Sequence, residues 1–102
     1  MATIEDLLTS LKRLESIAEE PNGSSANYII HFSDENQTKG TQLLEDAVSL
    51  ANELLINTDG SCNWRNMKIL QNNLYHCESL EEDRFGWLVA GIETSKGTLV
   101  YG

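Results

Sequence analysis

The fold is decided by the segment Gly86–Tyr101, which reads GWLVAGIETSKGTLVY. It contains two runs rich in β-forming residues, 86–94 and 98–101, with the tripeptide SKG between them. Gly97 in that tripeptide can adopt the positive φ that tight hairpin turns require. Gly91 inside the first run indicates a β-bulge or the close approach of another group. We therefore predict that the chain ends in a β-hairpin.

Two amphipathic helices are predicted upstream of the hairpin. In residues 3–20, apolar side chains recur at steps of three and four, Thr3 is suited to the N-cap, and Pro21 stops the helix. A turn, Pro21-Asn22-Gly23-Ser24-Ser25, follows. The same periodicity predicts a second helix over about 41–57, closed by Gly60 in a left-handed conformation.

The remaining segments give weaker signals. Residues 27–32 predict a strand, and because both of its faces are apolar we expect a central position in the sheet. The polar segment 33–40 predicts an exposed loop. Residues 61–80 fit either a helix or a strand, and we favour a short helix over 62–72 followed by a strand over 74–79. Asn72-Asn73 between them would supply the left-handed conformation that ends the helix.

This order of elements predicts an α+β fold. Helices precede most of the strands, and the last strands are joined by a tight turn, so two to three helices should pack on one face of a three- to four-stranded antiparallel sheet. The 102 residues leave room for one hydrophobic core, and we expect a single domain, 1–102.

The charge of the chain is strongly one-sided. Sixteen Asp and Glu against seven Lys and Arg give a net charge of -9, and residues 1–60 carry eleven of the acids but three of the bases. A field of this sign repels nucleic acids and membrane surfaces and attracts basic proteins. No apolar run approaches the length of a membrane span or of a signal-peptide core, so a cytoplasmic location is expected, with Cys62 and Cys77 as reduced thiols.

The candidates for catalysis or metal binding are sparse. Cys62, His76, Cys77 and His31 are the soft metal ligands, but their spacing contains no C-x-x-C or H-x-x-x-H pair. Adjacent residues of a strand point to opposite faces, which separates His76 from Cys77. The acidic run Glu78, Glu81, Glu82 and Asp83 is interpreted as a solvated loop between two strands. We expect neither a cofactor nor a metal, and a small metal- or thiol-dependent enzyme is the third hypothesis.

The preferred hypothesis is a non-enzymatic protein that inhibits or regulates a basic partner protein through an acidic surface. An immunity protein against a nuclease toxin or a phage-type inhibitor would have this size and charge. Helical carboxylates one turn apart, about 6 Å, approach the roughly 7 Å phosphate spacing of a DNA strand, so the surface could mimic nucleic acid. The residues expected to bind the partner are Glu15, Glu19, Asp34, Glu35, Asp46 and Glu53.

A structural or assembly subunit is the second hypothesis. Such a protein would bind through apolar contacts, or by pairing the hairpin edge, 98–101, with another strand, and it could form a homodimer. The large aromatic residues bear on this alternative, because one left outside the core would be a natural anchor for a partner. We expect core burial for these residues, Trp64, Trp87 and Tyr101.

Overall fold

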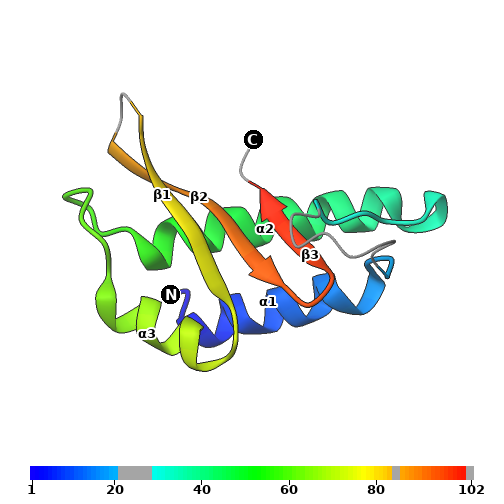
Figure 1. The fold of residues 1–102 in the computed structure, drawn as a ribbon, viewed down its shortest axis with the longest axis horizontal. Helices are drawn as coiled ribbons and strands as arrows, with labels where there is room; N and C mark the ends of the chain where they lie inside the picture. Colours follow the sequence, from blue (N-terminus) through cyan, green and yellow to red (C-terminus); the bar gives the residue numbers. More distant parts are fainter. Residues whose placement is uncertain (21–28, 84–85, 101–102) are drawn as a thin grey trace.

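Three helices pack with a three-stranded antiparallel sheet that ends in a C-terminal hairpin (Figure 1). The structure is a computed structural model that describes residues 1–20, 29–83 and 86–100, without the side chains of 78–83, 86–90 and 100. The predicted α+β class is confirmed. The elements are α1 Ile4–Ile17, the 3₁₀ helix η1 Asp34–Asn36, α2 Gln37–Leu55, α3 Trp64–Asn72, β1 His76–Asp83, β2 Gly86–Thr94 and β3 Gly97–Val100.

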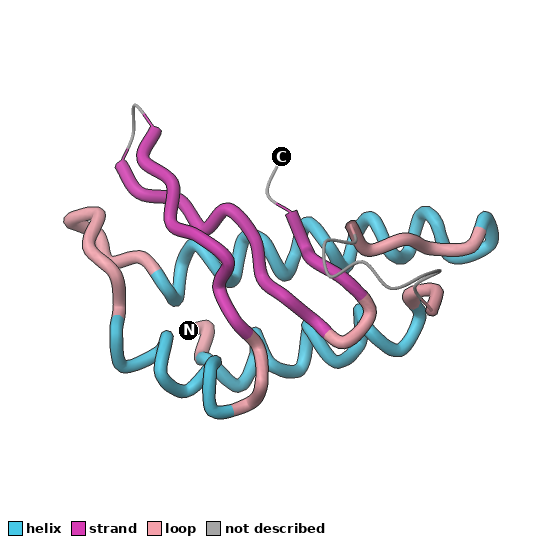
Figure 2. The backbone as a smooth tube through the Cα atoms, in the orientation of Figure 1, coloured by secondary structure: helices cyan, strands magenta, loops and turns pink. Residues whose placement is uncertain are grey.

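Helices α1 and α2 form a layer behind the sheet. They run side by side in opposite directions, and the three strands cross in front of them (Figures 1 and 2). The strand order is β1-β2-β3, so the hairpin β2–β3 and the longer ribbon β1–β2 share the central strand. The core lies between these layers, and among the described side chains the largest that are fully enclosed are Leu7, Leu11, Leu14, Leu55, Leu70, Ile92 and Leu99.

Helix α1 begins where the sequence predicts. Thr3 is the N-cap, and its backbone N–H donates a hydrogen bond of 2.8 Å to the Asp6 carboxylate. The helix ends at Ile17, three residues before the predicted end at residue 20. At this end Ala18 leaves the helical conformation and forms an antiparallel β-bridge with Phe32. The predicted turn at 21–25 lies outside the described residues.

The predicted loop at 33–40 is wrong. Asp34–Asn36 form η1, and α2 begins directly after it at Gln37, four residues before the predicted start. Sequence periodicity missed residues 37–40 because the first turn of α2 contributes no residue to the apolar stripe of the helix. Gly40 is buried in this turn, and a Cβ built on it would lie 2.4–2.5 Å from three atoms of the Phe32 ring. The ring of Phe32 therefore packs directly on the helix backbone.

Substituting Gly40 with Ala is expected to destabilise the protein. Alanine in a helix interior is favoured over glycine by about 1 kcal/mol, but displacing a packed ring costs about 1–3 kcal/mol. We expect a net loss of about 1 kcal/mol in the free energy of unfolding, measured by urea denaturation. The double variant Gly40→Ala/Phe32→Leu, which removes the ring, is the control. A Gly40→Ala protein more stable than the wild type would contradict the close contact between Gly40 and the Phe32 ring.

The predicted central strand at 27–32 is also wrong. Residues 27–28 lie outside the described part, and the rest makes two isolated bridges, Ile29 in parallel with Thr98 and Phe32 with Ala18. Ile30 is buried, whereas Ile29 is 59% exposed. The segment divides its backbone contacts between β3 and the end of α1, so no continuous ladder forms. The apolar residues at 29–32 therefore do not form the predicted central strand with both faces covered.

The C-terminal half follows the favoured interpretation with two corrections. A helix and a strand are present, but the residue with positive φ between them is Leu74, at 68°, and neither of the two asparagines. Strand β1 continues to Asp83, so the acidic run at 78–83 belongs to a strand and not to a loop. Hydrogen bonding across the β1–β2 ladder extends the strand beyond the point where polar residues begin.

The predicted glycine conformations are confirmed. Gly97 has φ 128° beside the hairpin turn, and Gly60 has φ 86°. The predicted role of Gly60 as the cap of the second helix is wrong, because α2 ends at Leu55 with Ile56 as its C-cap and Gly60 lies in the turn that follows. Gly91 pairs with Ser79 at a point where the β1–β2 register shifts, as expected for a bulge. In the part of the chain that the structure describes, no helix has the length and apolar character needed to cross a membrane.

Candidate functional site

The acidic residues predicted to form one surface are divided by the fold into separate groups. Three of them lie at one end of the helical layer, where α1 finishes and α2 starts. The backbone N–H of Glu19 donates a hydrogen bond of 2.8 Å to the His31 carbonyl, and this contact brings α1 against the segment that leads into η1. Glu19, Asp34 and Glu35 are all exposed. We call these three residues the acidic end.

The neighbouring acid, Glu20, is partly neutralised. Its carboxylate forms a salt bridge of 3.0 Å with the ammonium of Lys96, which also donates a hydrogen bond of 3.1 Å to the Ala18 carbonyl. Lys96 therefore satisfies a carbonyl at the carboxyl end of α1, where the helix dipole favours a cation. Among the described residues this is the one salt bridge, so the three carboxylates of the acidic end have no basic side chain paired with them.

Glu15 has a structural role instead. Its carboxylate accepts a hydrogen bond from the Tyr75 hydroxyl through one oxygen and from the Ser95 hydroxyl through the other. It thereby connects α1 to the start of β1 and to the hairpin turn. Burial, followed by the hydrogen bond and charge of Glu15, raises the pKa of Tyr75 well above its usual value. This carboxylate is half-buried and already occupied, so it is poorly placed to contact a partner.

Asp46 and Glu53 lie further along α2. They are exposed and seven residues apart, which corresponds to two turns and about 10 Å of helix. The amide of Gln42 donates a hydrogen bond of 3.0 Å to the Asp46 carboxylate. Asp46 also lines a groove between the two long helices, whereas Glu53 does not. The structure thus places Glu19, Asp34 and Glu35 at one end of the helical layer, whereas Asp46 and Glu53 lie further along α2 and the Glu15 carboxylate is occupied by Tyr75 and Ser95.

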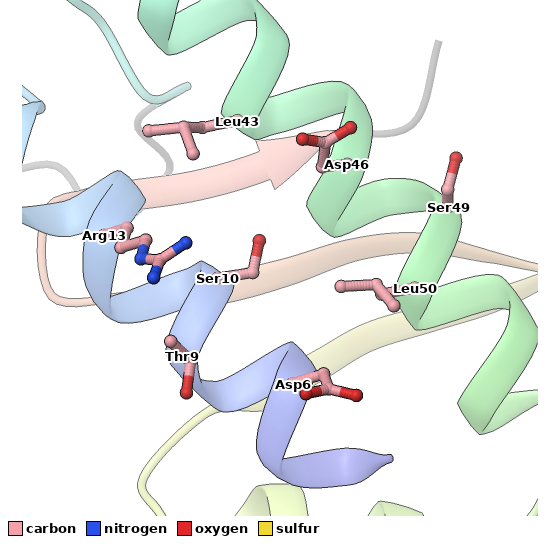
Figure 3. A pocket seen from close by; sticks show the side chains of 8 residues that line it. All are labelled: Asp6, Thr9, Ser10, Arg13, Leu43, Asp46, Ser49 and Leu50. Carbon is pink, nitrogen blue, oxygen red and sulfur yellow. The ribbon is translucent and has the colours of Figure 1, made fainter. Parts of the chain in front are cut away.

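The groove runs between α1 and α2 on the side turned away from the sheet. Its larger part has a volume of about 520 Å³, and Figure 3 shows polar side chains of both helices pointing into it. A second hollow of about 350 Å³ adjoins it, because Arg13 and Leu43 line both. Sequence periodicity could not find this groove, since it identifies the core stripe of each helix but not how the two helices pack against each other.

The thiols and histidines are distributed over separate elements. Cys62 and Cys77 are half-buried thiols that form no disulfide in the described part of the chain, and burial raises the pKa of the Cys62 thiol. His76 is exposed while Cys77 packs against the core. Among the side chains that the structure describes, which do not include those of 78–90, no three His, Cys, Asp or Glu lie close enough together to hold a metal ion.

The aromatic residues and the hairpin edge complete the list of predicted sites. Trp64 is 71% exposed at the start of α3, so its predicted burial in the core is wrong. The side chain of Trp87 and all of Tyr101 lie outside the description. At the edge of β3, the Thr98 carbonyl already accepts a hydrogen bond of 3.1 Å from the Ile30 N–H. Part of the edge proposed for strand pairing is therefore occupied by the chain itself.

Comparison with protein-family models, with curated proteins and with solved structures found no match to this chain.

Proposed function

We propose that this protein is a non-enzymatic regulator or inhibitor that binds a basic surface of a partner protein. The observation that carries the proposal is the acidic end, where exposed carboxylates from two segments distant in the sequence lie at the same end of the helical layer and take no part in the salt bridge found among the described residues. Desolvating and orienting such carboxylates against Lys or Arg of a partner yields electrostatic steering and specificity. The proposed setting is the cytoplasm, where the two thiols stay reduced.

The charge of the surrounding surface supports the same function. From η1 through α2, residues 34–55 carry five acids, Asp34, Glu35, Glu45, Asp46 and Glu53, against one base, Lys39. The resulting negative potential extends along a helix of 19 residues, about 28 Å. A basic groove that normally holds a nucleic-acid backbone is a suitable target for such a surface. A nuclease toxin or another nucleic-acid-binding protein is therefore the proposed class of partner.

Charge reversal at the acidic end tests the proposal. Affinity capture from the native host extract should retain a partner on the wild-type chain at about 50 mM salt and release it at about 500 mM, because surface charges are screened over a few ångströms at high ionic strength. Asp34→Lys/Glu35→Lys should weaken this binding roughly tenfold or more, since two attractive contacts become repulsive.

A matched variant separates the acidic end from total charge. Glu5→Lys/Glu93→Lys changes the net charge by the same four units, from -9 to -5, at exposed positions outside the acidic end. It should retain the partner nearly as well as the wild type. Equal loss of binding in both double variants, or capture that is insensitive to salt, would contradict the proposed site.

A further inference from the structure

The groove between α1 and α2 has opposite charges at its two ends. Asp6 and Asp46 line its larger part, Lys39 lines the adjoining hollow, and Arg13 lies where the two meet and lines both. Two of the three basic residues in the first sixty positions are therefore gathered in one place. Neither base takes part in the salt bridge found among the described residues, and both side chains are exposed. The groove thus presents unpaired cations within a strongly acidic protein.

The spacing of these charges is regular. Asp6 precedes Arg13 by seven residues on α1, and Lys39 precedes Asp46 by seven residues on α2, about 10 Å in each case. Because the two helices run in opposite directions, both acids lie toward one end of the groove and both bases toward the other. In Figure 3 Ser10 faces Asp46 across the groove, and the Arg13 side chain extends beneath Leu43.

A pattern of this kind is complementary to itself. A two-fold axis that lies across the groove at its centre reverses the direction of the groove, so the side with Asp6 and Asp46 in one copy meets the side with Arg13 and Lys39 in the other. Along the groove the charges follow the order Asp6, Asp46, Arg13 and Lys39, so the rotation brings Arg13 of each copy to the level of Asp46 of the other, across the shared groove, and brings the outer pair to one level likewise. Closed two-fold interfaces of this type use the same patch on both copies.

The floor of the groove suits the same arrangement. Leu43, Leu50 and Ile17 are half-buried along it, and Ser10 between the helices is 9% exposed. Two antiparallel helix pairs that face each other form a four-helix bundle, in which residues at these positions become the shared core. The local charge of the groove is balanced, so this face can approach its own copy although each chain carries a net charge of -9.

We propose that the α1–α2 groove is the interface of a homodimer, in which Arg13 of each copy pairs with Asp46 of the other. This inference is independent of the proposed function. It assigns Asp46 to self-association and leaves Glu19, Asp34 and Glu35 for a basic partner. If another protein covers this face instead of a second copy, the wild-type chain should sediment as a monomer in the test below.

Charge exchange at the inner pair tests the dimer. Sedimentation at about 50 mM salt should give twice the monomer mass of 11.4 kDa for the wild-type chain. Arg13→Asp and Asp46→Arg should each raise the dissociation constant at least tenfold, because each places like charges opposite one another. An equimolar mixture of these two variants should restore the dimer as a heterodimer, and so should the double variant in a single chain.

Neighbouring exposed residues provide controls with the same change in charge. Lys12→Asp matches Arg13→Asp, and Glu45→Arg matches Asp46→Arg, but neither position lines the groove. Both control variants should remain dimeric. Circular dichroism verifies that every variant is folded, and restoration in the mixture cannot arise from misfolding. A monomeric wild type at millimolar concentration, or a mixture that stays monomeric, would overturn the proposal.

Discussion

Replacing Glu15 with Ala is expected to lower the free energy of unfolding by about 2–3 kcal/mol. The loss arises because two hydroxyl groups, those of Tyr75 and Ser95, donate to one carboxylate, and hydrogen bonds to charged groups contribute about 1.5–3 kcal/mol each, less where they are exposed to solvent. The residue Tyr75 is 7% exposed, so its hydroxyl would lose a partner that water replaces poorly. Urea denaturation measures the effect.

A second measurement separates this role from a general loss of helix stability. The pKa of Tyr75 is raised first by burial and then by Glu15, so Tyr75, one of the three tyrosines, should ionise at lower pH in the Glu15→Ala protein than in the wild type. Absorbance of the phenolate reports this change. Glu19→Ala is the control, because that side chain is exposed two residues beyond the end of the same helix. Equal stability of the two variants would show that Glu15 does not connect α1 to the sheet.

Substituting Leu11 with Ala is expected to cost about 2–5 kcal/mol, the largest effect of any single change considered. Leu11 is fully buried in α1 and belongs to the hydrophobic core. Removing three carbon atoms there loses both their transfer from water and the contacts of the atoms that surround the cavity. Since small domains are stable by roughly 5–15 kcal/mol, this variant should be partly unfolded at moderate denaturant concentration.

Ile29→Ala is the control for that experiment. Ile29 has the same number of carbon atoms in its side chain but is 59% exposed, so the expected change is within about 0.5 kcal/mol. Equal destabilisation by both substitutions would contradict the burial of Leu11 and the exposure of Ile29.

The predicted partner-binding residues show where sequence reasoning about a surface reaches its limit. Glu15 and Glu19 are one helical turn apart, and their similar charge suggests a common role. The fold separates them, because Glu15 turns toward Tyr75 and Ser95 whereas Glu19 lies at the exposed end of α1. The contacts that distinguish them join residues sixty and eighty positions apart in the chain, which no local pattern contains.

The groove illustrates the same limit for basic residues. Arg13 and Lys39 are ordinary exposed side chains in the sequence, twenty-six positions apart. They line the same hollow because α1 and α2 pack in opposite directions, and neither helix alone specifies that partner. The seven-residue spacings within α1 and within α2 were visible in the sequence, but their significance depends on the registration of one helix against the other.

The sequence by itself determined the elements whose signals are local. The apolar stripe and N-cap fixed the start of α1, the tripeptide with Gly97 fixed the hairpin, and the order of helices and strands fixed the α+β class. The tertiary structure alone decided the rest. Residues 29–32 became a bridging segment, α2 gained its first turn beneath Phe32, and the acids were divided between the core side and the surface. The physical reason is that periodicity and turn chemistry act over a few residues, whereas burial, strand pairing and charge clustering depend on which distant segments pack together.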